Sequence, residues 1–181
     1  MAHIALKNED IPGISGLLYN RPDTAAPLMH LAQTILRGPS TLSEGERELI
    51  AASVSNWNGC HFCFSSHGAA AAVLLNRDID LLDDIREGLK ETEVSGKIRA
   101  LLVVAQKVQI NGKEVTADDI ARAKEEGATD DEIHDTVLVA AAFCMYNRYV
   151  DGLGTWSPKE KEAYRESGER LAKYGYGTRK S

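Results

Sequence analysis

Apolar residues recur along most of the chain at the spacing of helices that bury one face. Between residues 24 and 36, for example, Leu28, Leu31, Ala32, Ile35 and Leu36 form one apolar stripe. No run alternates β-branched or aromatic residues with polar ones between turn sequences, which is the pattern of a strand. The pattern therefore predicts an all-α fold.

Three Ser/Thr-x-x-Glu sequences mark helix starts, at residues 43–46, 129–132 and 157–160. In such a capping box the first and fourth side chains satisfy each other's free backbone N–H groups. Glycine and proline mark the breaks between helices. Together these signals predict helices over residues 24–36, 44–55, 60–76, 80–90, 96–109, 117–126, 132–149 and 158–173. We expect residues 1–22 to be an irregular arm and the residues after 173 to be a tail.

Length and composition indicate a single domain spanning residues 1–181. The chain has 181 residues, of which 43% are hydrophobic, enough for one core. Its net charge is −6 and its basic residues are scattered, which argues against nucleic acid or an anionic membrane surface as a partner. The N-terminus lacks the pattern of a signal peptide, and the longest apolar stretch, residues 137–146, is shorter than the roughly 20 residues of a bilayer span. We expect a soluble, cytoplasmic protein.

The chemistry that the chain can carry is concentrated in the sequence Cys60-x-x-Cys63-x-x-x-His67. Residues three, four and seven apart share one face of a helix, so the two thiols and the imidazole point the same way. A thiolate is the nucleophile in thiol chemistry, and a helix N-terminus or a neighbouring imidazolium stabilises it. In a reducing compartment two such closely spaced cysteines indicate a metal site or a catalytic site rather than a structural disulfide.

The preceding helix supplies a carboxylate for this face. Residues 56–59 form a short turn, so the helices on either side of it run antiparallel. Glu48 then lies opposite the first turns of the next helix, near His67. A carboxylate in that place orients the imidazole and stabilises its charged form.

Other interpretations of the same residues remain open. Cys60, Cys63, His67 and Glu48 could bind zinc, although zinc sites usually draw their ligands from two separate elements. Covalent haem attachment requires Cys-x-x-Cys-His, and here Phe64 follows the second cysteine. Both cysteines could also be inert core residues, which is our interpretation of Cys144, the third cysteine. We expect no cofactor and no bound metal.

The segment of residues 46–67 resembles the core of the AhpD-like alkylhydroperoxidases, within the carboxymuconolactone decarboxylase superfamily. The resemblance rests on Glu48, the Asn58-Gly59-Cys60 turn, Cys63 and His67 at the spacing of that family. A more diffuse similarity extends from about residue 16 to residue 148. The subgroup that the chain resembles most is described as peroxidase-related.

This resemblance implies an AhpD-like helical bundle, with the Cys-x-x-Cys pair on an antiparallel helix pair, that assembles as a dimer, trimer or hexamer. It also implies a peroxidase of the peroxiredoxin type, without haem or flavin. In the family pattern Cys63 attacks the hydroperoxide, Cys60 is the resolving thiol, and His67 with Glu48 forms a proton relay, with His61 nearby. The family also contains decarboxylases, which generally lack the cysteine pair.

Two other classes of function share these cysteines. A disulfide-exchange or redox-sensing module would use the pair without useful peroxide turnover, and a zinc-stabilised helical scaffold would lose structure on chelation. Under the peroxidase interpretation the partners are a small hydroperoxide and an unidentified dithiol electron donor. Apolar surface on the helices that contain Ile98 and Val137 leads us to expect a homo-oligomer.

Overall fold

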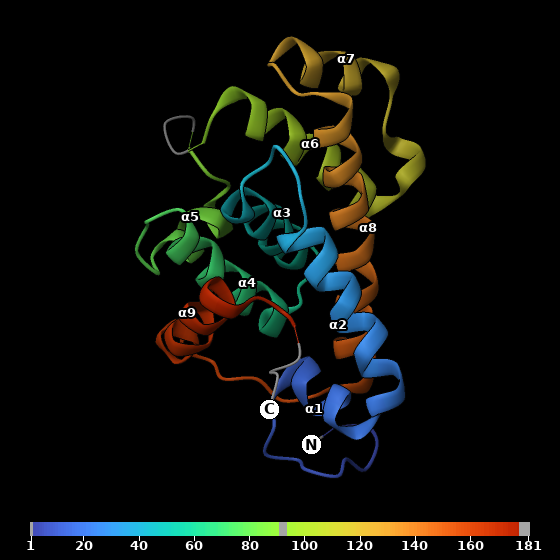
Figure 1. The fold of residues 1–181 in the computed structure, drawn as a ribbon, viewed down its shortest axis with the longest axis vertical. Helices are drawn as coiled ribbons and strands as arrows, with labels where there is room; N and C mark the ends of the chain where they lie inside the picture. The colour runs from blue at the N-terminus through green and yellow to red at the C-terminus, as the bar shows by residue number, and fades with distance from the viewer. Residues whose placement is uncertain (1, 91–93, 178–181) are drawn as a thin grey trace.

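The computed structural model describes residues 2–90 and 94–177. Within those residues all regular structure is helical, which confirms the predicted fold class (Figure 1). The α-helices are α1 (Gly13–Asn20), α2 (Pro22–Arg37), α3 (Glu44–Trp57), α4 (His61–Leu74), α5 (Leu81–Glu87), α6 (Gly96–Ile110), α7 (Ala117–Glu125), α8 (Asp130–Leu153) and α9 (Arg165–Tyr174). Two short 3₁₀ helices, η1 (Gly112–Glu114) and η2 (Lys161–Tyr164), precede α7 and α9.

Helix α3 lies at the centre of the molecule, and its most extensive contacts are with α4 (Figure 1). Every residue from Arg47 to Ser55 is buried, so this part of α3 is covered on all sides. Helix α9 covers α4, while the long helix α8 packs against both α3 and α6. The core therefore forms around α3 and the Ala-rich α4, and polar side chains that point from α3 toward its neighbours are withdrawn from water.

A tight turn joins α3 to α4 and places the cysteines. Gly59 has a φ of +75°, in the left-handed region that glycine adopts without steric cost. The backbone N–H of Cys60 then donates to the carbonyl of Ser55 at 3.0 Å. The two helices run antiparallel, as the short connection predicted.

The predicted capping boxes at Ser43 and Thr129 are both formed, each with the glutamate three residues on. Thr116 caps α7 in the same way, with Asp119 as its partner. The predicted helix bounds agree with the observed ones to within a few residues over most of the chain. Helix α8 is longer than predicted, because it continues to Leu153 and ends at Gly154.

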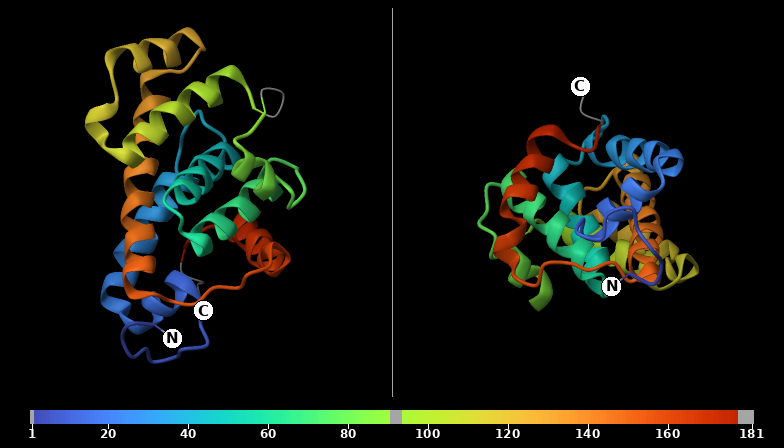
Figure 2. Two further views of the ribbon diagram at one scale, coloured as in Figure 1. Left: turned by 180° about the vertical axis from the view of Figure 1, so that it is seen from behind. Right: turned by 90° about the horizontal axis from the view of Figure 1, so that it is seen from below.

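The prediction for the N-terminal arm was wrong in part, because α1 forms within residues 1–22. The arm and α1 lie across the end of the molecule that also holds the N-terminus (Figures 1 and 2). The N–H of Gly13 donates to the carbonyl of Trp156, and the indole of Trp156 donates to the carbonyl of Glu9. These contacts with the distant segment after α8 anchor the start of α1, and local glycine and proline content does not reveal them.

The third predicted capping box, at Ser157, was also wrong. Glu160 is extended, with φ −83° and ψ +134°, so the predicted helix does not begin at Pro158; the 3₁₀ helix η2 starts at Lys161 and α9 at Arg165. The carbonyl of Pro158 binds the imidazole of His61 and accepts a hydrogen bond from the Tyr164 hydroxyl. Tertiary hydrogen bonds thus hold this segment extended where the local sequence favours a helix.

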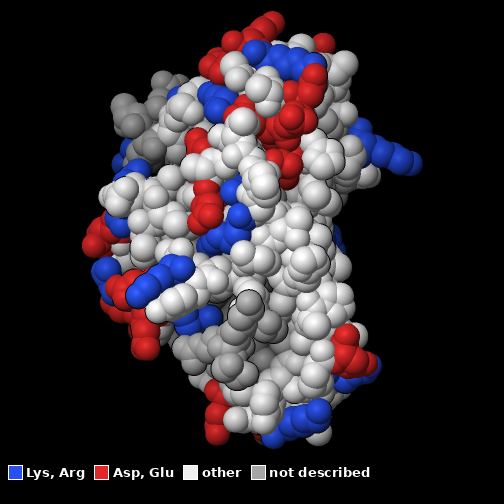
Figure 3. All heavy atoms as spheres, in the orientation of Figure 1, with Lys and Arg blue, Asp and Glu red and all other residues white. Residues whose placement is uncertain are grey.

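Acidic and basic side chains are interspersed at the two ends of the face shown in Figure 3, and the surface over α2 carries few charges. None of the helices in the described part of the chain has the combination of length and apolar character needed to cross a membrane.

Candidate active site

The two cysteines of the turn occupy different positions at the start of α4. Cys60 is the N-cap residue, and Cys63 lies in the first turn of the helix. Both are buried, with exposures of 0% and 2%, and they form a small apolar cluster with Val150 and Phe62. A hydrogen bond with Cys63, together with burial, raises the pKa of the Cys60 thiol far above its ordinary value. Cys60 is therefore held as a neutral thiol next to Cys63.

Glu48 and His67 meet across the α3–α4 pair, as the sequence predicted. The Nδ1 atom of His67 lies 2.7 Å from Oε2 of Glu48, whose side chain is fully buried. The edge of the Phe143 ring packs against the imidazole, with the ring centres 4.5 Å apart. One nitrogen of His67 is thus committed to the carboxylate, and Nε2 is the nitrogen available to a reactant.

Two residues that the sequence analysis did not single out complete this carboxylate site. Arg37, the last residue of α2, donates from Nη2 to Oε1 of Glu48 at 2.6 Å, and the hydroxyl of Tyr176 donates to the same oxygen at 2.6 Å. The Tyr176 hydroxyl also lies 3.0 Å from Nδ1 of His67. Tyr176 belongs to the segment that was expected to be a tail, and no spacing relates it or Arg37 to the Cys-x-x-Cys sequence.

Glu48 remains a carboxylate in this buried position. Burial by itself opposes its ionisation, but the charge and hydrogen bond of His67, followed by Arg37 and Tyr176, outweigh burial and lower its pKa. Burial and the adjacent Glu48 raise the pKa of Tyr176 well above its ordinary value. Tyr176 therefore keeps its proton and acts as a donor to Glu48.

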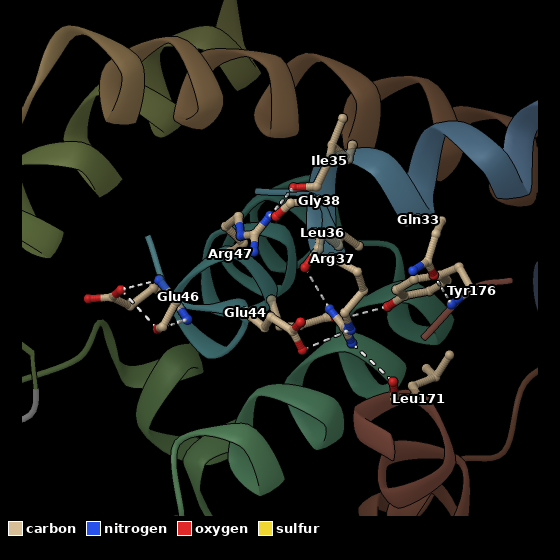
Figure 4. A network of polar contacts seen from close by, with 12 residues as sticks. Gln33, Ile35, Leu36, Arg37, Gly38, Glu44, Glu46, Arg47, Leu171 and Tyr176 are labelled. Atoms are coloured by element: carbon tan, nitrogen blue, oxygen red, sulfur yellow. Dashed lines mark hydrogen bonds and ion pairs between the residues drawn. The ribbon is translucent and has the colours of Figure 1, made fainter. Parts of the chain in front are cut away.

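Arg37 is itself fixed by several groups. Beyond Glu48 it donates to the carbonyls of Leu36 and Leu171, and its Nε lies 3.4 Å from a carboxylate oxygen of Glu44 (Figure 4). The neighbouring Arg47 donates to the carbonyls of Ile35 and Gly38 and so holds the end of α2 against α3 (Figure 4).

Two adjoining cavities lead to this site, with volumes of about 240 and 50 Å³. They share His67 and Tyr176 as wall residues, and the inner one reaches Cys63. The remaining walls are mainly apolar and come from α1, α2, α4, η2 and α9, with α8 in the smaller cavity. They include Ile14, Leu18, Met29, Phe62 and Leu171, with Ser15, Ser66, Tyr164, Ser167 and Arg170 as the polar members. A small apolar molecule can thus approach Cys63 beside His67.

The structure does not bring His61 into this group. Its Nε2 lies 2.9 Å from the carbonyl oxygen of Pro158, and its ring packs edge-on against Tyr164. Cys144 is also apart from the cysteine pair. It is half-buried on α8, where the amide of Asn58 lies 3.6 Å from its sulfur atom.

The ligand set that the sequence allowed for zinc is not assembled. Both oxygens of Glu48 already accept hydrogen bonds, from Arg37 and Tyr176 on one side and from His67 on the other. Across residues 2–90 and 94–177, no group of three or more His, Cys, Asp or Glu side chains is arranged to hold a metal ion.

A family model matches part of the chain. Residues 22–78, which contain Arg37, Glu48, both cysteines and His67, match the model of the carboxymuconolactone decarboxylase family. No curated protein matches the chain.

Three solved structures share the fold. An uncharacterized peroxidase-related protein with an alkylhydroperoxidase AhpD core, from Ralstonia eutropha JMP134, is 25% identical with a TM-score of 0.77, over 87% of this chain and 81% of that one. An uncharacterized peroxidase-related protein from Silicibacter sp. TM1040 is 24% identical with a TM-score of 0.74, over 86% and 79%. A protein of unknown function from Agrobacterium tumefaciens, described as a putative antioxidant defence protein AhpD, is 21% identical with a TM-score of 0.68, over 80% and 97%.

Proposed function

We propose that the protein is a cysteine-based hydroperoxide reductase, from the premise that residues 22–78 match the model of the carboxymuconolactone decarboxylase family and that the chain has an AhpD-like helical fold. The observation that carries the proposal is that Cys63 and His67 line one cavity and that Glu48, on the neighbouring helix α3, contacts His67. A thiol, a base and a group that orients the base are the components of an activated nucleophile.

In the first step Nε2 of His67 accepts the proton of the Cys63 thiol. The thiolate attacks one oxygen of the hydroperoxide, so that an S–O bond forms and the O–O bond breaks. His67 returns the proton to the departing alkoxide, which leaves as an alcohol. Sulfur is oxidised by two electrons to a sulfenic acid, and the peroxide is reduced by the same two electrons.

In the second step Cys60 resolves the intermediate. Its sulfur attacks the sulfenic acid of Cys63, an S–S bond forms, the S–O bond breaks, and water carries away the hydroxyl group and the thiol proton of Cys60. An external dithiol then restores both thiols by exchange and becomes a disulfide itself. We place this cycle in the cytoplasm, where such dithiol donors are kept reduced.

Three features support Cys63 rather than Cys60 as the attacking residue. Cys63 lines the inner cavity, whereas Cys60 is fully buried in the apolar cluster with Val150. Cys63 is also one helical turn from His67. The pKa of Cys60 is raised by burial and by its hydrogen bond with Cys63, so Cys60 keeps its proton while Cys63 reacts.

The shape and chemistry of the cavity support an organic hydroperoxide as the substrate. Apolar side chains from four helices surround a volume of about 240 Å³, which exceeds what hydrogen peroxide needs. Burial of an alkyl or aryl group there contributes roughly 25 cal/mol for each Å² of apolar surface removed from water.

The test is a single-turnover experiment with reduced, full-length protein and cumene hydroperoxide. Cys60→Ser should retain one stoichiometric burst of peroxide consumption and accumulate a sulfenic acid at Cys63, detected by dimedone trapping and mass spectrometry. Cys63→Ser should show no burst. His67→Ala should slow the burst by roughly 10²-fold or more, the size of a general-base effect. Cys144→Ser, the matched control, should behave as the unmodified protein.

Two outcomes would contradict the proposal. If Cys60→Ser loses the burst and Cys63→Ser keeps it, the roles of the two cysteines are reversed. If the unmodified protein consumes no peroxide but exchanges its disulfide rapidly with a protein dithiol, the site is a disulfide-exchange module.

A further inference from the structure

The chain after α9 turns back into the reactive centre. Gly175 ends α9 with a φ of +61°, and its N–H donates to the carbonyl of Leu171 at 2.9 Å. The next N–H, that of Tyr176, donates to Oε1 of Gln33 on α2 at 2.6 Å (Figure 4). These contacts direct the Tyr176 side chain inward, where only 6% of the residue remains exposed.

Arg37 ties this segment to the carboxylate. Its guanidinium donates to the carbonyl of Leu171 at 3.1 Å and to Glu48 at 2.6 Å, and its central carbon lies 5.2 Å from the centre of the Tyr176 ring. Three separate parts of the chain thus meet at the Glu48 carboxylate: the end of α2, the middle of α3 and the C-terminal segment.

Tyr176 also contacts the catalytic base itself. Its ring stacks on that of His67, with 17° between the ring planes and 5.8 Å between the ring centres. Its hydroxyl lies 2.6 Å from Glu48 and 3.0 Å from Nδ1 of His67. Because Arg37 and Tyr176 both donate to Oε1 of Glu48, Oε2 is left to accept the N–H of His67.

From this geometry we infer that Tyr176 is a positioning residue of the thiol site, which acts through Glu48 to hold Nδ1 of His67 on the carboxylate and so to leave Nε2 for Cys63 in the shared cavity. The inference rests on the proposed function of His67 as the base for Cys63. It makes the C-terminal segment a part of the reactive centre rather than a surface tail.

Charged and titratable groups surround His67 on several sides. They are Glu48 from α3 with Arg37 from α2 behind it, Cys63 from its own helix, Tyr146 from α8, Tyr164 from η2, and Arg170 and Tyr176 from the C-terminal region; the residues that α1 contributes to the same cavities are not titratable. Among these Tyr176 alone contacts both Glu48 and His67 through one atom. Its hydroxyl can therefore be removed to test the relay without changing a formal charge.

The experiment measures alkylation of Cys63 by iodoacetamide against pH in the full-length protein, with the modified peptide identified by mass spectrometry. Tyr176→Phe keeps the stacked ring and removes the hydroxyl. It should slow alkylation at pH 7 by about tenfold, as expected for the loss of a hydrogen bond to a charged group. The difference should narrow as the pH rises, because hydroxide then removes the thiol proton without the help of His67.

A double-mutant comparison separates positioning from general structural damage. In a His67→Ala background the additional Tyr176→Phe change should have no further effect, because a residue that acts through His67 has nothing left to position. Gln33→Ala removes the hydrogen bond to the Tyr176 backbone without altering the site itself. It should slow alkylation of Cys63 at pH 7 by a smaller factor than Tyr176→Phe does. Tyr174→Phe, two residues away and 64% exposed, is the matched control and should match the unmodified protein.

The inference is overturned if Tyr176→Phe alkylates at the unmodified rate at every pH, or if its effect adds in full to that of His67→Ala. Both outcomes differ from failure of the proposed function, because alkylation requires no hydroperoxide. If Tyr176 and His67 govern the alkylation rate of Cys63 but the protein consumes no peroxide, this inference holds and the proposed reductase activity is wrong.

Discussion

His67 on α4 and Glu48 on α3 are joined by a contact of 2.7 Å between Nδ1 and Oε2. The carboxylate is fully buried, and it is charged because three donors converge on it. A buried charge of this kind costs several kcal/mol of desolvation unless its partners are in place, so the relay is also a structural element. Changes to Glu48 are expected to affect both reactivity and folding.

The first prediction concerns acid stability. The folded-state pKa of Glu48 is lower than its ordinary value of 4.5, so its ionisation stabilises the folded protein above that pH. This contribution is lost as the pH falls below 4.5 toward the folded-state pKa. Glu48→Gln should reduce the free energy of unfolding at pH 7 by about 3–5 kcal/mol, because Arg37 loses its buried partner. It should also flatten the decline in stability below pH 4.5.

Urea unfolding measured at intervals between pH 3 and pH 7 checks this prediction. Glu125→Gln, an exposed substitution of the same kind on α7, serves as the control and should follow the unmodified protein throughout. If the free energy of unfolding of Glu48→Gln falls below pH 4.5 as steeply as that of the unmodified protein, other carboxylates dominate the pH dependence.

The second prediction concerns the oxidised state. Mild oxidation should form a reversible disulfide between Cys60 and Cys63, because cysteines three residues apart at the start of a helix are within bridging range. Cys144 should stay reduced, since it lies beside Asn58 and Gln109 rather than beside the pair. Peptide mapping by mass spectrometry before and after reduction gives the connectivity. A link between Cys144 and either partner would contradict this assignment.

The third prediction concerns substrate size. Leu18 lines both cavities, and a tryptophan in its place should occupy the space used by the organic part of the substrate. Leu18→Trp should lower kcat/KM for cumene hydroperoxide by about tenfold or more, the usual cost of a poor fit in an apolar pocket. The reaction with hydrogen peroxide should change little. Tyr19→Trp, at the neighbouring exposed position, is the control.

Steady-state rates with cumene hydroperoxide and with hydrogen peroxide test this prediction. Equal losses for the two substrates, or no loss for either, would mean that the cavity does not bind the organic group.

The fourth prediction concerns assembly. Leu138 and Met145 lie seven residues apart on one face of α8, and they are 40% and 42% exposed. We expect this face to be covered in a homo-oligomer, since exposed apolar surface on helices favours association. Sedimentation velocity at micromolar concentration should show a dimer or a larger species, which Leu138→Glu should weaken. Ala121→Glu, at an exposed position on α7, should leave assembly unchanged. A stable monomer in the unmodified protein would contradict the prediction.

The sequence by itself determined the features that depend on neighbours along the chain. Helical periodicity and the boxes that begin at Ser43 and Thr129 gave most of the helices, because capping satisfies backbone groups within four residues. The same local rules placed the two cysteines and His67 at the start of one helix. The short turn at Gly59 then predicted Glu48 beside His67, since a tight connection leaves two helices little choice but to pack antiparallel.

Tertiary structure alone decided which groups complete the site. Arg37, Glu48 and Tyr176 are separated by 11 and 128 residues, and no period relates them. Tyr176 is held in place by Gln33 and Arg37, and the segment at Ser157 stays extended because Pro158 binds His61 and Tyr164. In each case the burial of a polar group requires a partner from a distant segment, and that requirement outweighs the local preference for a tail or a helix.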